Sequence, residues 1–379
     1  MKDVYITKLS VFLPNEPVSN DEMEDYLGFI NGKKSKSKAI VLRSNKIEQR
    51  YYAMDKNGVP THTNAELVAT AIRKMITSDS EMKNVELLAC GTATPDQLLP
   101  SHAVMVHGLL PESSDMEVIS NSGSCCASMQ AFRHAYLAIK AGDKNSAICS
   151  GSERVSTILR ADNFEEEAKK LEEIDKNPYI AFEKDFLRWM LSDGAGVFLL
   201  ENKKSENGLS LKVEWVDILS FANSLPTCMY MGAAKDSEGN LVGYQDMPWQ
   251  KVVDESVMSI KQDVKLLGEN IITKGFSSLR DLLIKKKVEV SEIDYFLPHL
   301  SSHFFQDKIY KELADNGIEI PYDKWFMNLK TCGNTGSGSI YIMLEDLYSS
   351  GKLKIGDKIL LAVPESARFS FAFSLLTVC

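Results

Sequence analysis

The chain has 379 residues, of which 44% are hydrophobic and 25% charged, a composition typical of a globular protein with a large buried core. Its net charge of −9 argues against general nucleic-acid binding. No apolar run has the roughly 20 residues of a membrane span, and the N-terminus lacks a signal-peptide core. The seven cysteines show neither CxxC nor zinc-ligand spacing, so a reducing, cytoplasmic setting is expected.

The first half of the chain predicts alternating strands and helices. A strand is expected over residues 4–13, a helix over 64–76 and a buried strand over 85–91. Residues 162–176 are rich in Glu and Lys and predict an exposed helix, whereas 192–200 predict a glycine turn that leads into a strand. This alternation indicates an α/β fold.

A basic segment stands out in the first part of this acidic chain. Its candidate ligand-binding residues are Lys33, Lys34, Lys36, Lys38 and Arg43. A lysine run is commonly a solvated loop. A basic patch also attracts acidic partners and phosphate groups, so both interpretations stay open.

Residues 121–144 carry the strongest chemical signal. Small residues lead to Cys125 and Cys126, and a helical pattern follows that Gly142 is expected to end. A cysteine at the start of a helix lies near free N–H groups and the positive end of the helix dipole, which favour the thiolate. Most buried cysteines are nevertheless inert, so the position alone does not identify a nucleophile.

The second half repeats elements of the first. Seventeen positions separate Cys125 from Gly142, and seventeen separate Asn334 from Gly351. In both places a glycine, an aspartate and a lysine then precede an apolar strand, which indicates a duplicated strand–turn–helix–strand unit. The expected halves are residues 1–205 and residues 206–379.

Two polar residues of the second half are candidates for a site with the cysteine. His299 follows a buried strand predicted over 293–298, and the carboxyl end of such a strand is a common place for a site. Asn334 lies in the glycine turn before the repeated helix. Each is also typical of an ordinary strand end or turn. His303 follows His299 by four positions, but HLSSH lacks the glutamate of HExxH, so no metal is expected.

Together these motifs resemble the thiolase-like condensing enzymes, and most closely the β-ketoacyl-acyl-carrier-protein synthase III family. The matching motifs are Pro100–Ser101, the cysteine helix, Asp193–Gly196, Pro298–His299 and Gly333–Thr335. The resemblance implies a thiolase-like five-layer αβαβα sandwich of two duplicated half-domains, usually a homodimer. It also implies acyl-CoA or acyl carrier protein thioesters as substrates, and no other cofactor.

The resemblance implies a Claisen-type condensation through an acyl-cysteine. Cys125 takes the acyl group, and a second thioester loses CO₂ or a proton to give the attacking carbanion. His299 and Asn334 then hydrogen-bond the developing enolate, and both are expected to act after loading. Backbone N–H groups of Cys125 and of residues 366–368 hold the oxyanion. The basic segment lies near the tunnel mouth in this family and would bind the carrier or a phosphopantetheine phosphate.

The chain departs from the family at three places. Leu-Ser-Ser follows Pro298–His299, Phe304 replaces a docking arginine, and Glu365 and Arg368 stand in a loop that is usually glycine-rich. The two charged residues either alter the site or form an outward-facing ion pair. These departures predict a specialised branch similar to dialkylresorcinol or aryl-polyene enzymes. The alternatives are a ring-forming condensing enzyme and a non-catalytic partner subunit.

Overall fold

The computed structural model describes residues 1–32, 34–35, 37–165 and 187–379. Its principal sheet has nine strands in the order β13-β14-β15-β8-β1-β7-β6-β4-β5. The strands of the first half are β1 (Tyr5–Phe12), β4 (Leu87–Thr92), β5 (Glu117–Ser122), β6 (Ser146–Glu153) and β7 (Gly194–Glu201). The strands of the second half are β8 (Leu211–Ser220), β13 (Tyr295–Pro298), β14 (Lys358–Glu365) and β15 (Ser370–Val378).

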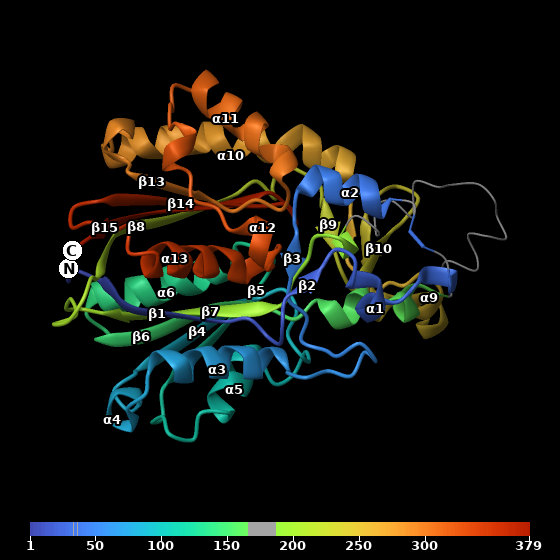
Figure 1. Cartoon of the computed structure of the whole chain (residues 1–379), viewed down its shortest axis with the longest axis horizontal. Coiled ribbons are helices and arrows are strands. Elements are labelled where there is room, and N and C mark those ends of the chain that lie inside the picture. Colours follow the sequence, from blue (N-terminus) through green and yellow to red (C-terminus); the bar gives the residue numbers. More distant parts are fainter. Residues whose placement is uncertain (33, 36, 166–186) are drawn as a thin grey trace.

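Helices lie in three layers around the two halves of this sheet. They are α3 (Asn64–Met75), α5 (His102–Gly108), α6 (Ala127–Ala141), α10 (Val264–Lys286), α11 (Gln306–Asp315) and α13 (Ser339–Ser349). Figure 1 shows α3 and α5 outside the first half-sheet, α6 and α13 between the half-sheets, and α10 and α11 outside the second. The expected five-layer αβαβα sandwich is therefore confirmed.

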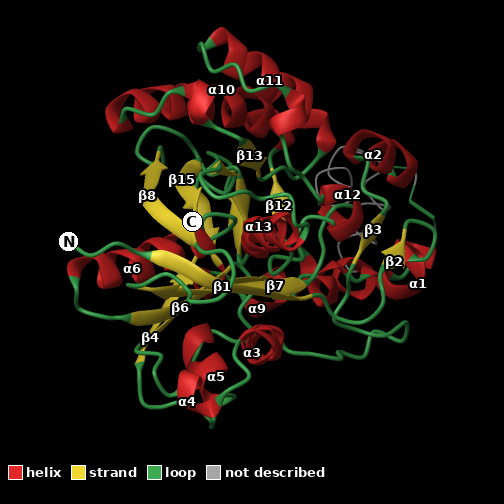
Figure 2. Ribbon diagram, turned by 60° about the vertical axis from the view of Figure 1, so that its left-hand side comes forward, coloured by secondary structure: helices red, strands yellow, loops and turns green. Residues whose placement is uncertain are grey.

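Smaller elements surround one end of the sandwich. The helices are α1 (Met23–Leu27), α2 (Lys38–Asn45), α4 (Asp79–Met82), α9 (Trp249–Asp254) and α12 (Leu329–Cys332). The strands are β2 (Val18–Ser19), β3 (Gln49–Arg50), β9 (Met229–Tyr230), β10 (Ala233–Lys235), β11 (Leu241–Gly243) and β12 (Lys261–Gln262). Figure 2 shows α1, α2, α12, β2 and β3 grouped beside the central helix α13.

The strand pairing shows the duplication directly. In the first half β4 is parallel to β6, and β7 pairs antiparallel with both β6 and β1. In the second half β13 is parallel to β14, and β15 pairs antiparallel with both β14 and β8. The halves join where Tyr5 and Ile6 of β1 pair with Lys212 and Leu211 of β8. The exact division after residue 205, in the turn between β7 and β8, stays a prediction.

Helix α6 occupies the centre of the sandwich. Its apolar residues are buried on more than one side, and Gly142 ends it in the left-handed conformation at φ 87°. Gly91 on β4 lets the helix lie close to the sheet, because a Cβ there would be 2.3 Å from the carbonyl carbon of Ala127. The start of α6 is consequently fixed at the carboxyl ends of β4 and β6.

The sequence pattern predicted some elements of the sandwich and missed others, in the middle of the sheet as well as at its edge. The expected strands at 4–13 and 85–91 and the helix at 64–76 correspond to β1, β4 and α3. Most of the expected helix 162–176 lies outside the described residues. Strands β5, β8 and β15 and helix α10 had not been predicted. No helix in the described part of the chain is long and apolar enough to cross a membrane.

Candidate active site

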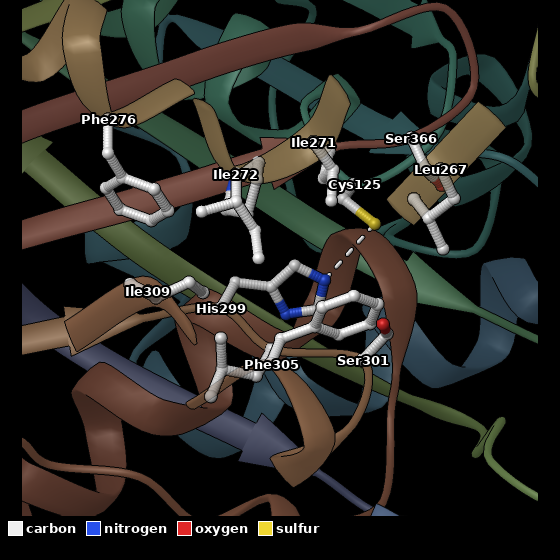
Figure 3. A pocket seen from close by; sticks show the side chains of 12 residues that line it. Cys125, Leu267, Ile271, Ile272, Phe276, His299, Ser301, Phe305, Ile309 and Ser366 are labelled. Atoms are coloured by element: carbon white, nitrogen blue, oxygen red, sulfur yellow. Dashed lines mark hydrogen bonds between the residues drawn. The ribbon is translucent and has the colours of Figure 1, made fainter. Parts of the chain in front are cut away.

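Cys125 lies in the turn that leads into α6, and its sulfur contacts a histidine from the second half. The Sγ atom is 3.2 Å from Nε2 of His299 (Figure 3). It is also 3.7 Å from Oγ of Ser124. Cys126 is fully buried, and its sulfur lies 3.3 Å from the carbonyl oxygen of Val363. Of the two adjacent cysteines, only Cys125 therefore faces the histidine, which favours it as the nucleophile.

His299 is held by the second half-sheet. Its amide donates to the carbonyl of Ala362 at 2.8 Å, which continues the pairing of β13 with β14 by one residue. Only 3% of its surface is exposed. Burial lowers the pKa of His299 to about 4, because the charged imidazolium loses its hydration. At neutral pH the ring is neutral, so Nε2 can accept a proton from the thiol.

The surroundings of Cys125 favour the thiol, although its position at a helix start favours the thiolate. Burial and, next, the charge of Glu365 raise the pKa of Cys125 to about 12, and Glu153 adds to the effect. The hydrogen bond from Ser124 acts in the opposite direction without overcoming it. The helix start is too deeply enclosed and too close to carboxylates for its dipole to stabilise the thiolate.

Glu365, the last residue of β14, turns inward to this same turn. Its Oε2 accepts hydrogen bonds from the amides of Ser124 at 3.2 Å and Cys126 at 2.9 Å, and only 8% of its surface is exposed. Burial raises the pKa of Glu365, although the two amides lower it in part. Arg368 is exposed, and its Nε donates to the carbonyl of Leu225 at 3.3 Å. The outward-facing ion pair considered above is therefore wrong.

Asn334 lies in the glycine turn before α13. Its amide donates to Met190 at 3.0 Å, and its Oδ1 accepts from the amide of Gly336 at 3.0 Å. No hydrogen bond joins Asn334 to Cys125 or His299 in the described part of the chain. Gly333 and His299 line a common small cavity, so the asparagine turn lies beside the histidine loop.

The turns of the two halves are packed together through buried contacts. A Cβ added to Gly151 would lie 2.3 Å from the carbonyl oxygen of Ser337 and 2.6 Å from Cβ of Ser128. The two turns therefore leave no room for a side chain at this position. Beside them, the carboxylate of Glu153 accepts from Oγ of Ser337 at 2.8 Å and from Oγ1 of Thr94 at 2.6 Å. The duplication therefore brings both helix starts to one place.

A small apolar cavity opens onto the cysteine and histidine. Figure 3 shows side chains of α10 and α11 around it, together with those of the histidine loop. The apolar lining residues are Leu267, Ile271, Ile272, Phe276, Leu300, Phe305, Ile309 and Pro364. Sequence reasoning missed the α10 residues. Leu267 and Ile271, four positions apart after the helix cap at Asp263, were the signal that could have shown them.

Comparisons with known proteins agree with this arrangement. The family model 3-oxoacyl-[acyl-carrier-protein] synthase III C terminal matches residues 283–364. The chain is 23% identical over 367 residues to β-ketoacyl-[acyl-carrier-protein] synthase III of Clostridium perfringens, with 95% of each chain covered. It is 24% identical over 356 residues to the same enzyme of Anaplasma marginale, with 93% of each covered.

Solved structures share the fold over the whole chain. AbyA1, a tetronic acid condensing enzyme, matches with a TM-score of 0.74 at 18% identity, covering 99% of both chains. OleA of Xanthomonas campestris, with bound lauric acid and lauroyl-CoA, matches with 0.72 at 18% identity and 99% coverage of both. The chain is similar to the synthase III enzymes over nearly its whole length, and its fold is thiolase-like.

The basic segment of this synthase III-like chain is only partly available to a ligand. Lys33 and Lys36 lie outside the described residues. The Nζ of Lys38 is 2.8 Å from the carboxylate of Glu24, and its side chain is only 15% exposed, so it is engaged within the chain. Lys34 and Arg43 are exposed and remain candidates for contact with a carrier or a phosphate.

Proposed function

We propose that the chain condenses two thioesters through an acyl group carried on Cys125. The observation that carries the proposal is the contact between Sγ of Cys125 and Nε2 of His299, 3.2 Å apart at an apolar cavity. A nucleophile needs a base within hydrogen-bond reach, and His299 meets that requirement. The apolar lining suits an alkyl acyl chain, which gains free energy when it leaves water.

Acyl loading follows from the protonation states of the pair. The Cys125 thiol transfers its proton to neutral His299 while Sγ attacks the carbonyl carbon of the acyl thioester. The bond from that carbon to the carrier sulfur then breaks, and the departing thiolate takes the proton from His299. The amide of Cys125 donates to no other residue in the described part of the chain, so its N–H is available to the tetrahedral oxyanion.

Condensation uses the same histidine in a different role. The second thioester loses CO₂ or an α-proton, and the resulting enolate carbon attacks the acyl carbonyl on Cys125. The bond to Sγ breaks, and the cysteine thiolate takes a proton from solvent, which in the non-decarboxylative case balances the α-proton released to solvent. His299, with its proton on Nε2, and the side-chain amide of Asn334 donate hydrogen bonds to the enolate oxygen. Because His299 contacts Sγ, it gains a role in acyl loading in addition to the role in condensation that the sequence suggested.

The donor and the assembly are part of the same proposal. The acyl group comes from acyl carrier protein or coenzyme A, as the names of the related synthases suggest. A homodimer in the cytoplasm is proposed from the same resemblance, and all seven cysteines are free, which suits a reducing compartment. The edge strand β5 pairs only with β4 among the described strands, so its other edge is open to a second copy.

Two alanine variants test the proposal. The purified chain is incubated with an acyl-CoA and a malonyl or second acyl thioester, and products are identified by mass spectrometry. Cys125→Ala should abolish both acyl loading and product, whereas Cys126→Ala should retain both. Loss of activity in Cys126→Ala alone would contradict the assignment. A cyclised product would identify the ring-forming alternative, and absence of product with any thioester pair would favour the non-catalytic one.

A further inference from the structure

A buried carboxylate lies directly beside the proposed nucleophile, and the reaction described above does not use it. Glu365 comes from β14, while the turn that it contacts belongs to the other half of the chain, so 239 positions separate Glu365 from Cys126. Its Oε2 accepts from the two amides that flank Cys125 in sequence. The contact therefore holds the backbone on both sides of the nucleophile.

The setting of Glu365 differs from that of the other buried glutamate nearby. Glu153 accepts hydrogen bonds from Ala93, Thr94 and Ser337, and these contacts connect strand ends to the glycine turn. Glu365 accepts only the two amides of the nucleophile turn among the described residues, and no lysine or arginine of that part of the chain pairs with it. An unpaired buried carboxylate is costly, so its retention at this turn needs a reason.

We propose that Glu365 is a positioning residue for acyl transfer: its carboxylate fixes the turn around Cys125 and keeps the free enzyme in the thiol form. The first part follows from the two hydrogen bonds, which occupy N–H groups at the start of α6. The second follows from charge, because a carboxylate this close opposes a second negative charge on sulfur. The inference rests on the proposed role of Cys125 as the nucleophile.

The charged groups around the sulfur support this direction. Glu365 faces Cys125 from β14 and Glu153 from β6, and both oppose the thiolate. His299, from the loop after β13, is neutral, since burial lowers its pKa to about 4. No lysine or arginine in the described chain is among the groups that shift the pKa of Cys125. A thiol in these surroundings loses its proton only when a substrate offers the carbonyl that Sγ attacks.

The pH profile of Cys125 alkylation tests the proposal on the wild-type chain. Iodoacetamide is added at a series of pH values, and peptide mapping follows the Cys125 peptide separately from the other cysteines. The expected rate still rises above pH about 8.5, the ordinary cysteine value. A rate that levels off below pH 8 would overturn the proposal, and this outcome does not depend on any variant's folding.

Glu365→Gln isolates the charge, because glutamine keeps an oxygen for the two amides. The alkylation midpoint should move to lower pH. At a pH below both midpoints, lowering the midpoint by about one pH unit raises the thiolate fraction about tenfold and the alkylation rate about threefold, since a less basic thiolate is less nucleophilic. The matched control is Glu319→Gln, which removes an exposed carboxylate after α11 and should leave the profile unchanged. A folded Glu365→Gln with the wild-type midpoint would overturn the proposal.

Glu365→Ala removes both the charge and the hydrogen-bond acceptor. It should lower the rate of acyl loading on Cys125 well below that of Glu365→Gln, because only the alanine variant frees the flanking amides. Equal loading rates in the two variants would contradict the positioning role. The alkylation profile does not require any acyl transfer. A chain that fails to load acyl groups but shows the predicted profile would refute the proposed function and the positioning role in acyl transfer, and would leave only the effect of Glu365 on the Cys125 thiol.

Discussion

At the scale of single residues, the Cys125–His299 contact separates two roles that the sequence had placed together. The resemblance put His299 and Asn334 side by side as donors to an enolate. In the structure His299 contacts the sulfur at 3.2 Å, whereas Asn334 has no hydrogen bond to either residue within the described chain. We therefore propose that His299 acts in loading as well as in condensation, and that Asn334 acts only in condensation.

Substitution of each residue by alanine should separate these roles. Asn334→Ala should load acyl groups at nearly the wild-type rate and condense on the order of 100- to 1000-fold more slowly, the usual effect of losing one donor to a developing charge. His299→Ala should slow both steps, because the thiol also loses its proton acceptor. Single-turnover loading and steady-state product formation measure the two steps separately. Wild-type loading in folded His299→Ala would refute the role in loading.

Burial of two histidines predicts a loss of stability in acid. The pKa values of His299 and His102 are both lowered by burial to about 4, against an ordinary value near 6.5. The unfolded chain then binds more protons than the folded chain between these values. Stability should therefore be complete above pH about 6.5 and fall as the pH decreases toward 4.

Urea unfolding at pH 7 and pH 4.5 measures this dependence. The midpoint of the wild type should be lower at pH 4.5. The urea midpoint of a His102→Gln/His299→Gln double variant should decrease less between pH 7 and pH 4.5, because glutamine does not titrate. If the wild type and the double variant lose the same amount, other groups are responsible for the acid sensitivity.

At the scale of elements, close contact between helix and strand fixes the site. Gly91 of β4 lies under the start of α6, and an added Cβ would be 2.3–2.4 Å from the backbone of Ala127 and Ser128. Gly91→Ala should therefore destabilise the fold by about 1–3 kcal/mol or more and displace the nucleophile turn. Gly108→Ala is the control, because no atom lies within 4 Å of a Cβ there.

Chemical denaturation and acyl loading measure both parts of this prediction. Gly91→Ala should show a lower unfolding midpoint and slower loading on Cys125. Gly108→Ala should stay within about 0.5 kcal/mol of the wild type, as is usual for an exposed substitution. A Gly91→Ala variant that matches the wild type in both would show that α6 can move away from β4 without consequence.

The sequence predicted those elements whose local residue pattern is sufficient to specify a helix or a strand. Helix α6 has apolar residues at helical spacing and a glycine stop, and α13 repeats that arrangement. Helix α10 was missed because Gly268 and Gly275 interrupt its pattern. The reason for Gly275 is tertiary: a Cβ there would lie 2.4 Å from the ring of Phe371 on β15. The orientation of Glu365 was likewise undecided, because only packing shows that its side chain turns toward α6.

At the scale of the whole molecule, the proposed use of an acidic carrier protein would bring that partner to a chain that is itself acidic. Its net charge of −9 opposes such an encounter unless a local basic surface offsets it. Lys34 and Arg43 are exposed on the α2 side of the molecule, and α2 packs near the loop that follows His299. Lys203 and Lys204 lie in the turn between β7 and β8, close to the N- and C-terminal residues of the chain. Figure 1 shows both termini at the end of the molecule away from α2.

Charge reversal at the two ends tests this account of docking. Lys34→Glu/Arg43→Glu should raise the apparent KM for a carrier-bound substrate, and most clearly at low salt, because exposed charges are screened beyond about 8 Å at physiological ionic strength. It should leave an N-acetylcysteamine thioester nearly unaffected. Lys203→Glu/Lys204→Glu is the matched control and should change neither. Equal loss with both substrates would show that the α2 side is not a docking surface.

The central claim is that a single cysteine carries the acyl group. The most direct test is intact-mass measurement of the wild-type chain after incubation with a panel of acyl-CoA thioesters, followed by peptide mapping of the adduct. One acyl group per chain, attached to Cys125, is expected. An acyl group on Cys126, or a folded chain that no thioester modifies, would contradict it.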